Sequence, residues 1–176
     1  MANVNKLNEA SVFLIGKALY AAQFTEFVLK MILLHCKNDQ VLKNDKRIAP
    51  VTIDKFLADS EDGEKFRKMT LGQLAKLVPE PLNFSEQKLT KYVSDRNLLA
   101  HGLFEKINPL RGESSFDHDQ FLNAFIQDSK ALHTAMLGFL RLAIVALAAR
   151  QGKTNEVSLD SGALADIEAY INHSAG

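Results

Sequence analysis

A long apolar segment without proline near the N-terminus constrains the fold most. Residues 5–36 contain a single glycine, Gly16, and their apolar side chains recur around most of a helical circumference. We therefore expect one long helix that is central to its domain or shared with a partner subunit. Its polar residues Gln23, Glu26 and Lys30 form one narrow stripe, which is expected to be a solvated edge or to face a functional cleft. Glu26 and Lys30 are also spaced as an i,i+4 ion pair.

The rest of the chain is predicted to form further helices separated by polar connections. Thr70 and Gln73 have the spacing of a capping box, and Asn83 with Glu86 offers a second one. Gly102 is expected to mark a loop after the second of these helices. The expected helices cover 52–58, 70–78, 83–101, 117–150 and 161–171, and the expected connections or turns cover 37–51, 59–63, 108–112 and 151–157.

These elements predict an all-α fold, an antiparallel bundle of about five to six helices. We expect residues 1–150 to form the bundle. Residues 151–176 would add a polar linker and a short C-terminal helix packed on the same domain. A chain of 176 residues that is 47% hydrophobic is long enough to bury such a core.

Composition and charge exclude several classes of function. The chain has 21 basic and 21 acidic residues, which argues against a protein that binds nucleic acid mainly by neutralising phosphates. It still allows an enzyme that contacts a few phosphates in a cleft. The single cysteine, Cys36, excludes an internal disulfide. No glycine-rich phosphate loop is present, and we expect no cofactor and no metal. Asp117, His118 and Asp119 are interpreted as a helix start and its cap.

The sequence favours a cytoplasmic protein without a membrane span. The N-terminal ten residues are polar and lack the apolar core of a signal peptide. The most apolar stretch, 137–149, contains Arg141 and is too short to cross a bilayer. A lone cysteine also fits a reducing compartment.

The candidate functional residues of this chain interrupt an apolar stripe on the predicted 83–101 helix. The inward stripe of the 83–101 helix begins with apolar residues, Leu89, Tyr92 and Val93. Arg96 and Asn97 then occupy positions where further apolar residues are expected, and burying them unpaired costs several kcal/mol. Asn97 and His101 are four residues apart, so the amide can orient the imidazole. Arg96 lies about 140° of helix rotation from His101, although its long side chain can still reach the same site.

Two interpretations of Arg96, Asn97 and His101 are open on these grounds. A cation, an amide and a group that titrates near neutrality suit metal-free phosphoryl chemistry on RNA. One histidine is half of an acid–base pair, which a symmetric dimer would complete. Alternatively, Arg96 pairs with Asp95, Glu26 or a partner carboxylate and His101 caps a helix end.

The string RNLLAH, continuing into GLF, resembles the Arg-x4–6-His signature of the HEPN superfamily, including a polar residue directly after the arginine. The preceding TLG helix resembles that of some members. The two long helices complete the order of elements in this family, so the resemblance covers roughly residues 10–150.

The resemblance implies a compact helical bundle that dimerises and brings two motif copies into one interfacial cleft. Many relatives are metal-independent endoribonucleases that act as toxins or in phage defence, which implies RNA as substrate and an antitoxin protein as partner. Carried over, Arg96 would position and stabilise the phosphate, Asn97 would orient the site, and His101 would be the acid or base. The family also contains modules that only dimerise or bind, and this is the alternative function.

Overall fold

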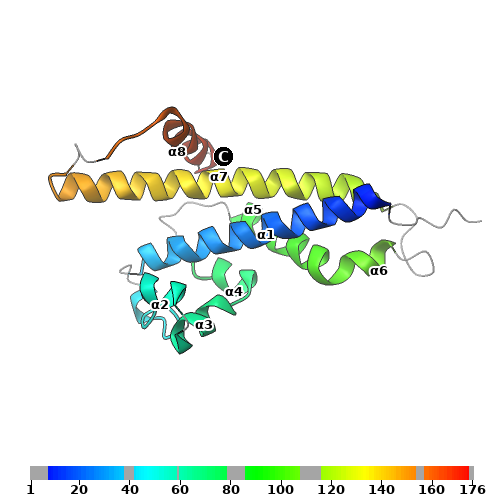
Figure 1. The fold of residues 1–176 in the computed structure, drawn as a ribbon, viewed down its shortest axis with the longest axis horizontal. Helices are drawn as coiled ribbons and strands as arrows, with labels where there is room; N and C mark the ends of the chain where they lie inside the picture. Colours follow the sequence, from blue (N-terminus) through cyan, green and yellow to red (C-terminus); the bar gives the residue numbers. More distant parts are fainter. Residues whose placement is uncertain are drawn as a thin grey trace, which may run out of the picture.

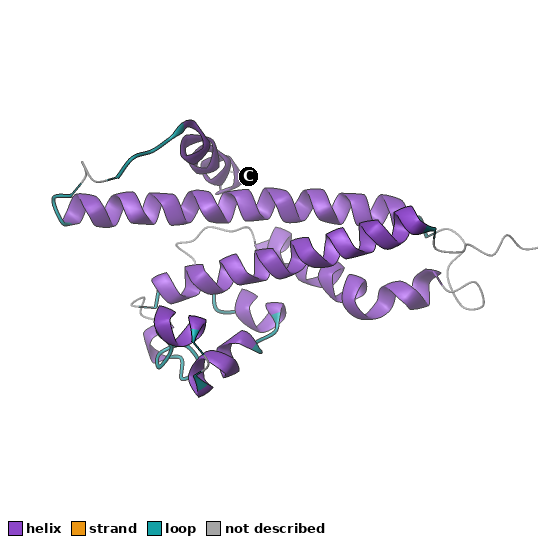
Figure 2. Ribbon diagram, viewed as in Figure 1, coloured by secondary structure: helices purple, strands orange, loops and turns teal. Residues whose placement is uncertain are grey.

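The protein is an all-α helical bundle built on two long helices. The structure, a computed structural model, describes residues 8–37, 42–58, 60–78, 86–107, 116–153 and 157–174, and these residues contain helices and turns but no strand. The predicted fold class is confirmed. Helices α1 (Glu9–His35) and α7 (His118–Arg150) lie side by side, and the smaller helices cover their flanks (Figures 1 and 2).

The arms of the bundle alternate in direction along the chain. Helices α5 (Glu86–Asn97) and α6 (Leu103–Ile107), which come between α1 and α7 in the sequence, run in the opposite direction to α1, so α1 and α7 point the same way (Figure 1). Their N-terminal ends are joined at Ser11, whose hydroxyl lies 3.1 Å from Asp119 Oδ1 and 3.3 Å from His118 Nε2. Asn8 caps α1 through a 2.8 Å bond from the Ser11 amide. Residues 5–7 of the predicted helix lie outside the described residues.

Three short helices follow α1 and are set by polar caps. These are α2 (Ile53–Leu57), α3 (Glu61–Arg67) and α4 (Leu71–Ala75), capped by Thr52, Ser60 and Thr70. The predicted capping box of Thr70 and Gln73 is confirmed, although α4 ends before Val78. The turn expected over 59–63 is wrong for the described residues 60–63, because the Ser60 hydroxyl accepts the amide of Gly63 and α3 starts at Glu61. Leu42–Asn44 forms a 3-10 turn within the expected connection.

The helical arm that carries the polar motif does not stop at Gly102. Helix α5 (Glu86–Asn97) continues through a π-helical turn, Leu98–Gly102, directly into α6 (Leu103–Ile107). The loop expected at Gly102 is therefore wrong. A side chain at Gly102 would meet Leu98 Cδ1 at 3.0 Å, so a small residue fits this turn best. The second predicted capping box and the 108–112 loop fall on residues outside the described ranges.

Helix α8 (Ser161–Ser174) packs on the outer side of α7 (Figure 1). The contact is close at Gly138, where an added Cβ would lie 1.9 Å from the carbonyl oxygen of Asp166. An ion pair of 3.0 Å joins Arg141 to Asp166, and the Phe139 and Tyr170 rings meet edge to face. Asp117 caps α7 by accepting the Gln120 amide at 2.9 Å, as predicted.

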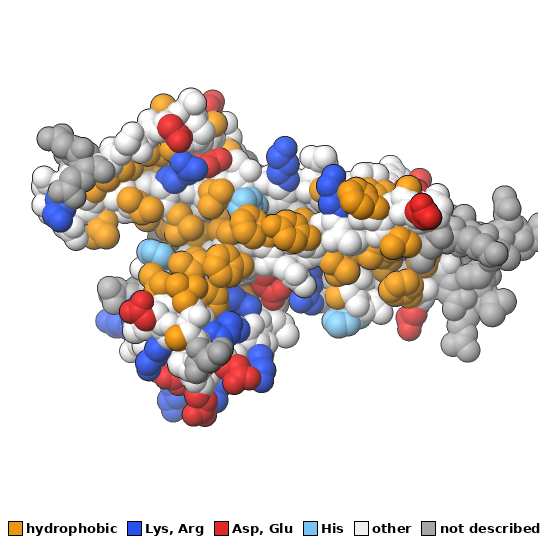
Figure 3. Space-filling view, viewed as in Figure 1, with side chains coloured by type: hydrophobic (Ala, Val, Ile, Leu, Met, Phe, Trp, Pro, Cys, Tyr) orange, Lys and Arg blue, Asp and Glu red, His pale blue; other side chains and the backbone are white. Residues whose placement is uncertain are grey.

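A large part of the apolar surface of α1 remains uncovered. Hydrophobic side chains form a band over α1 and its junction with α7, whereas charged side chains gather over α2–α4 (Figure 3). The exposed large residues of α1 are Val12, Phe13, Leu19, Tyr20, Phe24 and Phe27. Helices α1 and α7 are each long and apolar enough to cross a membrane, a property that core helices of soluble bundles share. The absence of a membrane span therefore stays a prediction.

Candidate functional site

The three motif residues differ in their surroundings. Arg96 is half-buried, whereas Asn97 and His101 are exposed. The inward stripe of this arm runs through Leu89, Tyr92, Leu99 and Leu103, which are buried. It bypasses Asn97, so the expectation that this amide interrupts the core is wrong. Arg96 alone needs a partner in the interior of the bundle.

That partner is Glu26 on α1. Nη2 of Arg96 lies 3.5 Å from Oε2 of Glu26, and their side chains are 23% and 12% exposed. This is one of the pairings that the structural interpretation of the motif named. The polar stripe of α1 therefore faces the motif helix, and its interpretation as a solvated edge is wrong for Glu26 and Lys30, which are both buried.

Lys30 is held by the backbone at the end of α3. Its ammonium group donates a 2.7 Å hydrogen bond to the carbonyl oxygen of Arg67, in place of the expected ion pair with Glu26. Burial lowers the pKa of Lys30, the Glu26 carboxylate opposes this shift, and the Arg96 guanidinium adds to it. Lys30, Glu26 and Arg96 therefore form one electrostatic unit between α1 and α5.

The π-helical turn changes the relation between Arg96 and His101. Hydrogen bonds from residue i to i+5 widen the turn, so residues five apart come closer to one face than in an α-helix. The angle between these two side chains is thus smaller than the 140° expected of a regular helix. π-Helical turns of this kind are frequent at functional sites.

A surface groove adjoins this unit. Its volume is about 550 Å³, and its lining comprises Gln23, Glu26, Phe27, Lys30, Phe56, Leu57 and Arg67. Arg67 is fixed because its guanidinium donates to the carbonyl oxygens of Phe56 and Ala58. The sequence offered a signal for the α1 residues, since a polar stripe interrupts an apolar helix. It gave none for Arg67, which lies between the turn expected over 59–63 and the helix expected over 70–78, where no element was predicted.

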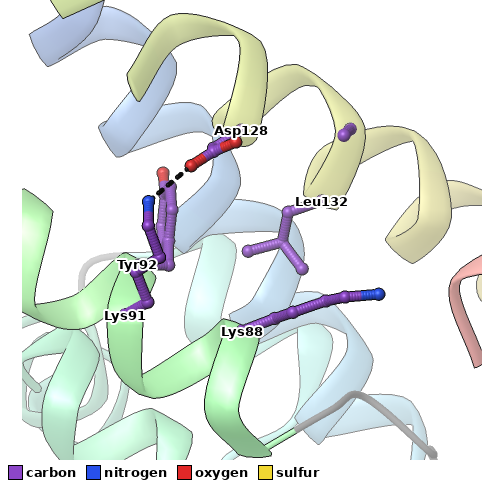
Figure 4. Close-up of a pocket in the computed structure, with 6 residues that line it drawn as sticks. Lys88, Lys91, Tyr92, Asp128 and Leu132 are labelled. Carbon is purple, nitrogen blue, oxygen red and sulfur yellow. Dashed lines mark hydrogen bonds and ion pairs between the residues drawn. The ribbon is translucent and has the colours of Figure 1, made fainter. Parts of the chain in front are cut away.

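A second groove separates α5 from α7 and shows how the motif helix is fastened (Figure 4). Lys91 bridges Asp95 and Asp128 at 2.8 Å each, and its pKa is raised by these two bonds. Between the same two helices, the Ser129 hydroxyl donates to the Tyr92 hydroxyl at 3.1 Å, and burial raises the pKa of this tyrosine. Asp95 therefore pairs with Lys91, whereas Arg96 contacts the Glu26 carboxylate.

No protein-family model matches the chain, and no curated protein or solved structure shows significant similarity to it. The resemblance to the HEPN superfamily therefore stays a prediction from the sequence motif. Among the described residues, no group of three or more His, Cys, Asp or Glu side chains is placed to hold a metal ion.

Proposed function

We propose that this protein is a HEPN-like, homodimeric, metal-independent endoribonuclease that cleaves single-stranded RNA. The observation that supports this most is an exposed His101 on the π-helical turn that directly follows α5, the helix whose Arg96 is held in place by Glu26. A solvent-accessible imidazole can transfer protons and a fixed guanidinium can stabilise negative charge, and phosphodiester transfer uses both functions.

In the proposed reaction, the imidazole of one His101 takes the proton of a ribose 2′-OH. The 2′-oxygen attacks the adjacent phosphorus, and the bond from phosphorus to the 5′-oxygen breaks. His101 of the second copy gives a proton to the leaving 5′-oxygen, so the products carry a 2′,3′-cyclic phosphate and a 5′-OH. Arg96 stabilises the extra negative charge on the phosphorane. Asn97, exposed and four residues before His101, would orient the imidazole.

The uncovered face of α1 supports a homodimer. Phe13, Tyr20 and Phe27 recur every seven residues on that face and are 68%, 68% and 42% exposed. Gly16 lies between the first two, and nothing occupies the space where its side chain would be. A ring from a second copy of α1 fits such a gap, as knobs fit holes in coiled coils.

Cleavage in a chelator tests the enzymatic proposal. The wild-type protein, His101→Ala and Arg96→Ala would be incubated with single-stranded RNA in EDTA. We expect the wild-type protein to cut the RNA and each variant to be slower by about 100-fold or more. Equal cutting by all three proteins would contradict the proposal. A cytoplasmic location and an antitoxin partner belong to the same proposal.

The second candidate is a non-catalytic dimerisation or binding module of the same superfamily. The Arg96–Glu26 pair favours it, because an arginine with an intramolecular partner has a structural role without any substrate. This function predicts that Arg96→Ala changes the elution volume or melting temperature while no RNA is cut by any form. Size-exclusion chromatography and thermal melting of the same variants separate the two candidates.

A further inference from the structure

The exposed face of α1 is arranged symmetrically about Tyr20. Phe13 and Phe27 each lie seven positions from Tyr20. Gly16 and Phe24 each lie four positions from it. Four and seven positions are close to one and two turns of an α-helix, so these residues share one face. A two-fold axis at Tyr20 matches each position with the one equally far on its other side, so this face can pair with a copy of itself that runs in the opposite direction.

The two copies would fit together at Gly16 and Phe24. Beyond the helix itself, no described atom lies within 4 Å of a Cβ placed on Gly16, and Phe24 is 43% exposed. The Phe24 ring is already held in place, since it stacks on Tyr20 with centroids 6.1 Å apart and contacts the His133 ring at 4.6 Å. Phe24 of each copy would therefore enter the gap at Gly16 of the other, as a knob enters a hole.

The charge on this face also favours an antiparallel pairing. Lys17 is the one charged residue among the exposed positions from Val12 to Phe27. If two copies of α1 ran parallel about a two-fold axis, the two Lys17 side chains would lie at the same level, and like charges at an interface oppose association. In the antiparallel pairing Lys17 lies opposite Gln23, because each is three positions from Tyr20. An uncharged amide at that position removes the repulsion.

The direction of the pairing determines where the two motifs lie. Arg96 contacts α1 at Glu26. Helix α7 contacts another side of α1, where the His133 ring meets Phe24. Glu26 and Phe24 are about 200° apart around α1, so the α5–α6 arm and α7 lie on opposite flanks of the exposed face. A two-fold axis across α1 keeps both arms on one side of the paired helices, whereas an axis along α1 puts them on opposite sides. The antiparallel pairing is therefore the one that lets both copies of His101 face one cleft.

His101 lies close to the level of the same axis. The α5–α6 arm runs opposite to α1 (Figure 1), and Arg96 is level with Glu26 where their side chains meet. His101 follows Arg96 by five positions, so at the α-helical rise it is level with about residue 21 of α1. An axis at Tyr20 therefore leaves the two His101 side chains at nearly the same level along the paired helices. The motif and the pattern of α1 point to the same axis independently.

We infer that a second copy of this chain binds with its α1 antiparallel to the first, about a two-fold axis at Tyr20, and that both α5–α6 arms then flank one cleft. The pairing itself follows from α1, and only the joint use of the two His101 side chains rests on the proposed function. RNA would enter this cleft from the side of the arms, opposite α7.

Cysteine cross-linking of the full-length protein tests this pairing. Cys36→Ser removes the native thiol, and Tyr20→Cys, Phe13→Cys and Phe27→Cys are each made in that background. Tyr20→Cys lies on the axis, so mild oxidation should link two copies, since a disulfide needs Cα atoms within about 7 Å of each other. Phe13→Cys should not link to itself, because its two copies would lie about 21 Å apart along the helix. A mixture of Phe13→Cys and Phe27→Cys should link, because these positions meet.

Non-reducing gels measure the yield of linked dimer. Gln127→Cys, at an exposed position of α7, is the matched control in the same background. We expect about tenfold more linked dimer from Tyr20→Cys and from the mixture than from Phe13→Cys alone or Gln127→Cys. The mixture keeps the test valid if loss of the Tyr20 ring weakens the dimer, and thermal melting checks that each variant is folded. Efficient linking of Phe13→Cys to itself, or no linking by either Tyr20→Cys or the mixture, would overturn the pairing.

Cleavage of RNA by the same proteins separates the pairing from the nuclease. A Tyr20→Cys dimer that links efficiently, while neither it nor the wild-type protein cuts RNA in EDTA, would support the pairing and contradict the nuclease. Cleavage that requires His101, by a protein whose Phe13→Cys variant links to itself, would overturn the pairing alone.

Discussion

Arg96 on α5 and Glu26 on α1 are 70 positions apart in the chain, and their side chains meet at 3.5 Å across the bundle. The pair ties the motif helix to the polar stripe of the first helix. It also fixes the guanidinium at the boundary between the interior and the groove. The location of Arg96 therefore depends on a residue that the motif itself does not contain.

Removing the Glu26 charge should destabilise the fold. In Glu26→Gln the half-buried guanidinium loses its carboxylate, and we expect the free energy of unfolding to fall by about 2 kcal/mol, less than for a fully buried pair. Chemical denaturation measures this change. Glu105→Gln alters an exposed acid on α6 and should remain within about 0.5 kcal/mol of wild type. Similar stability of both variants would show that the Arg96–Glu26 contact contributes little.

The close packing of α8 on α7 depends on the lack of a side chain at Gly138. The methyl group of Gly138→Ala would overlap the Asp166 carbonyl, so α8 must shift, and we expect a loss of about 2 kcal/mol or more. Gly162→Ala is the matched control, because its nearest neighbour would be at an ordinary 3.4 Å. Thermal melting of the two variants compares them directly, and equal melting temperatures would refute the tight contact.

His133 should make stability depend on pH. The centroids of the His133 and Phe24 rings are 4.6 Å apart, and the buried Nε2 of His133 has no hydrogen-bond partner among the described residues. Burial lowers the pKa of His133, with partial opposition from Asp166. The unfolded chain thus binds the proton more readily, and stability falls as the pH drops from about 7 through the ordinary histidine pKa of about 6.5 towards the lowered folded value.

Replacing the imidazole should remove that dependence. His133→Leu is expected to melt higher than wild type at pH 5.5 by a larger margin than at pH 7.5. Melting curves over this pH range provide the measurement. A margin that is the same at both pH values would mean that His133 titrates alike in the folded and unfolded chain.

The uncovered face of α1 should hold the dimer together. Tyr20→Glu places a charge at the centre of this face, where Tyr20 is 68% exposed. We expect the dissociation constant of the dimer to rise at least tenfold. Sedimentation velocity reports the change in mass. Gln127→Glu, on α7, should sediment as wild type does. A Tyr20→Glu protein that stays dimeric would place the interface on another surface.

Local patterns predicted the helices better than the points where they end or meet. The capping signals at Thr70 and Asp117 lie within a few residues of the helices they start, and both were confirmed. Gly102 suggested a loop, but the buried Leu99 and Leu103 keep the arm helical through the π turn. Tertiary packing outweighs the conformational preference of one glycine in this case.

The site was only partly predictable for a similar reason. A polar residue on an apolar stripe identified Arg96, and the pairing with Glu26 was one of the expected possibilities. The predicted apolar stripe also placed Asn97 in the interior, but Asn97 is exposed and Leu99 is buried in its place. The groove was invisible in sequence because Arg67 and Lys30 are brought together only by the packing of α3 on α1.

The chemical nature of the RNA ends tests the central claim most directly. Wild-type protein and His101→Ala, matched in melting temperature because His101 is exposed, would be incubated with one RNA in EDTA and the fragments analysed by mass spectrometry. We predict fragments that end in 2′,3′-cyclic phosphate with wild type and at least 100-fold fewer with His101→Ala. Equal yields from both proteins, or intact RNA with both, would contradict the assignment of this bundle as a ribonuclease.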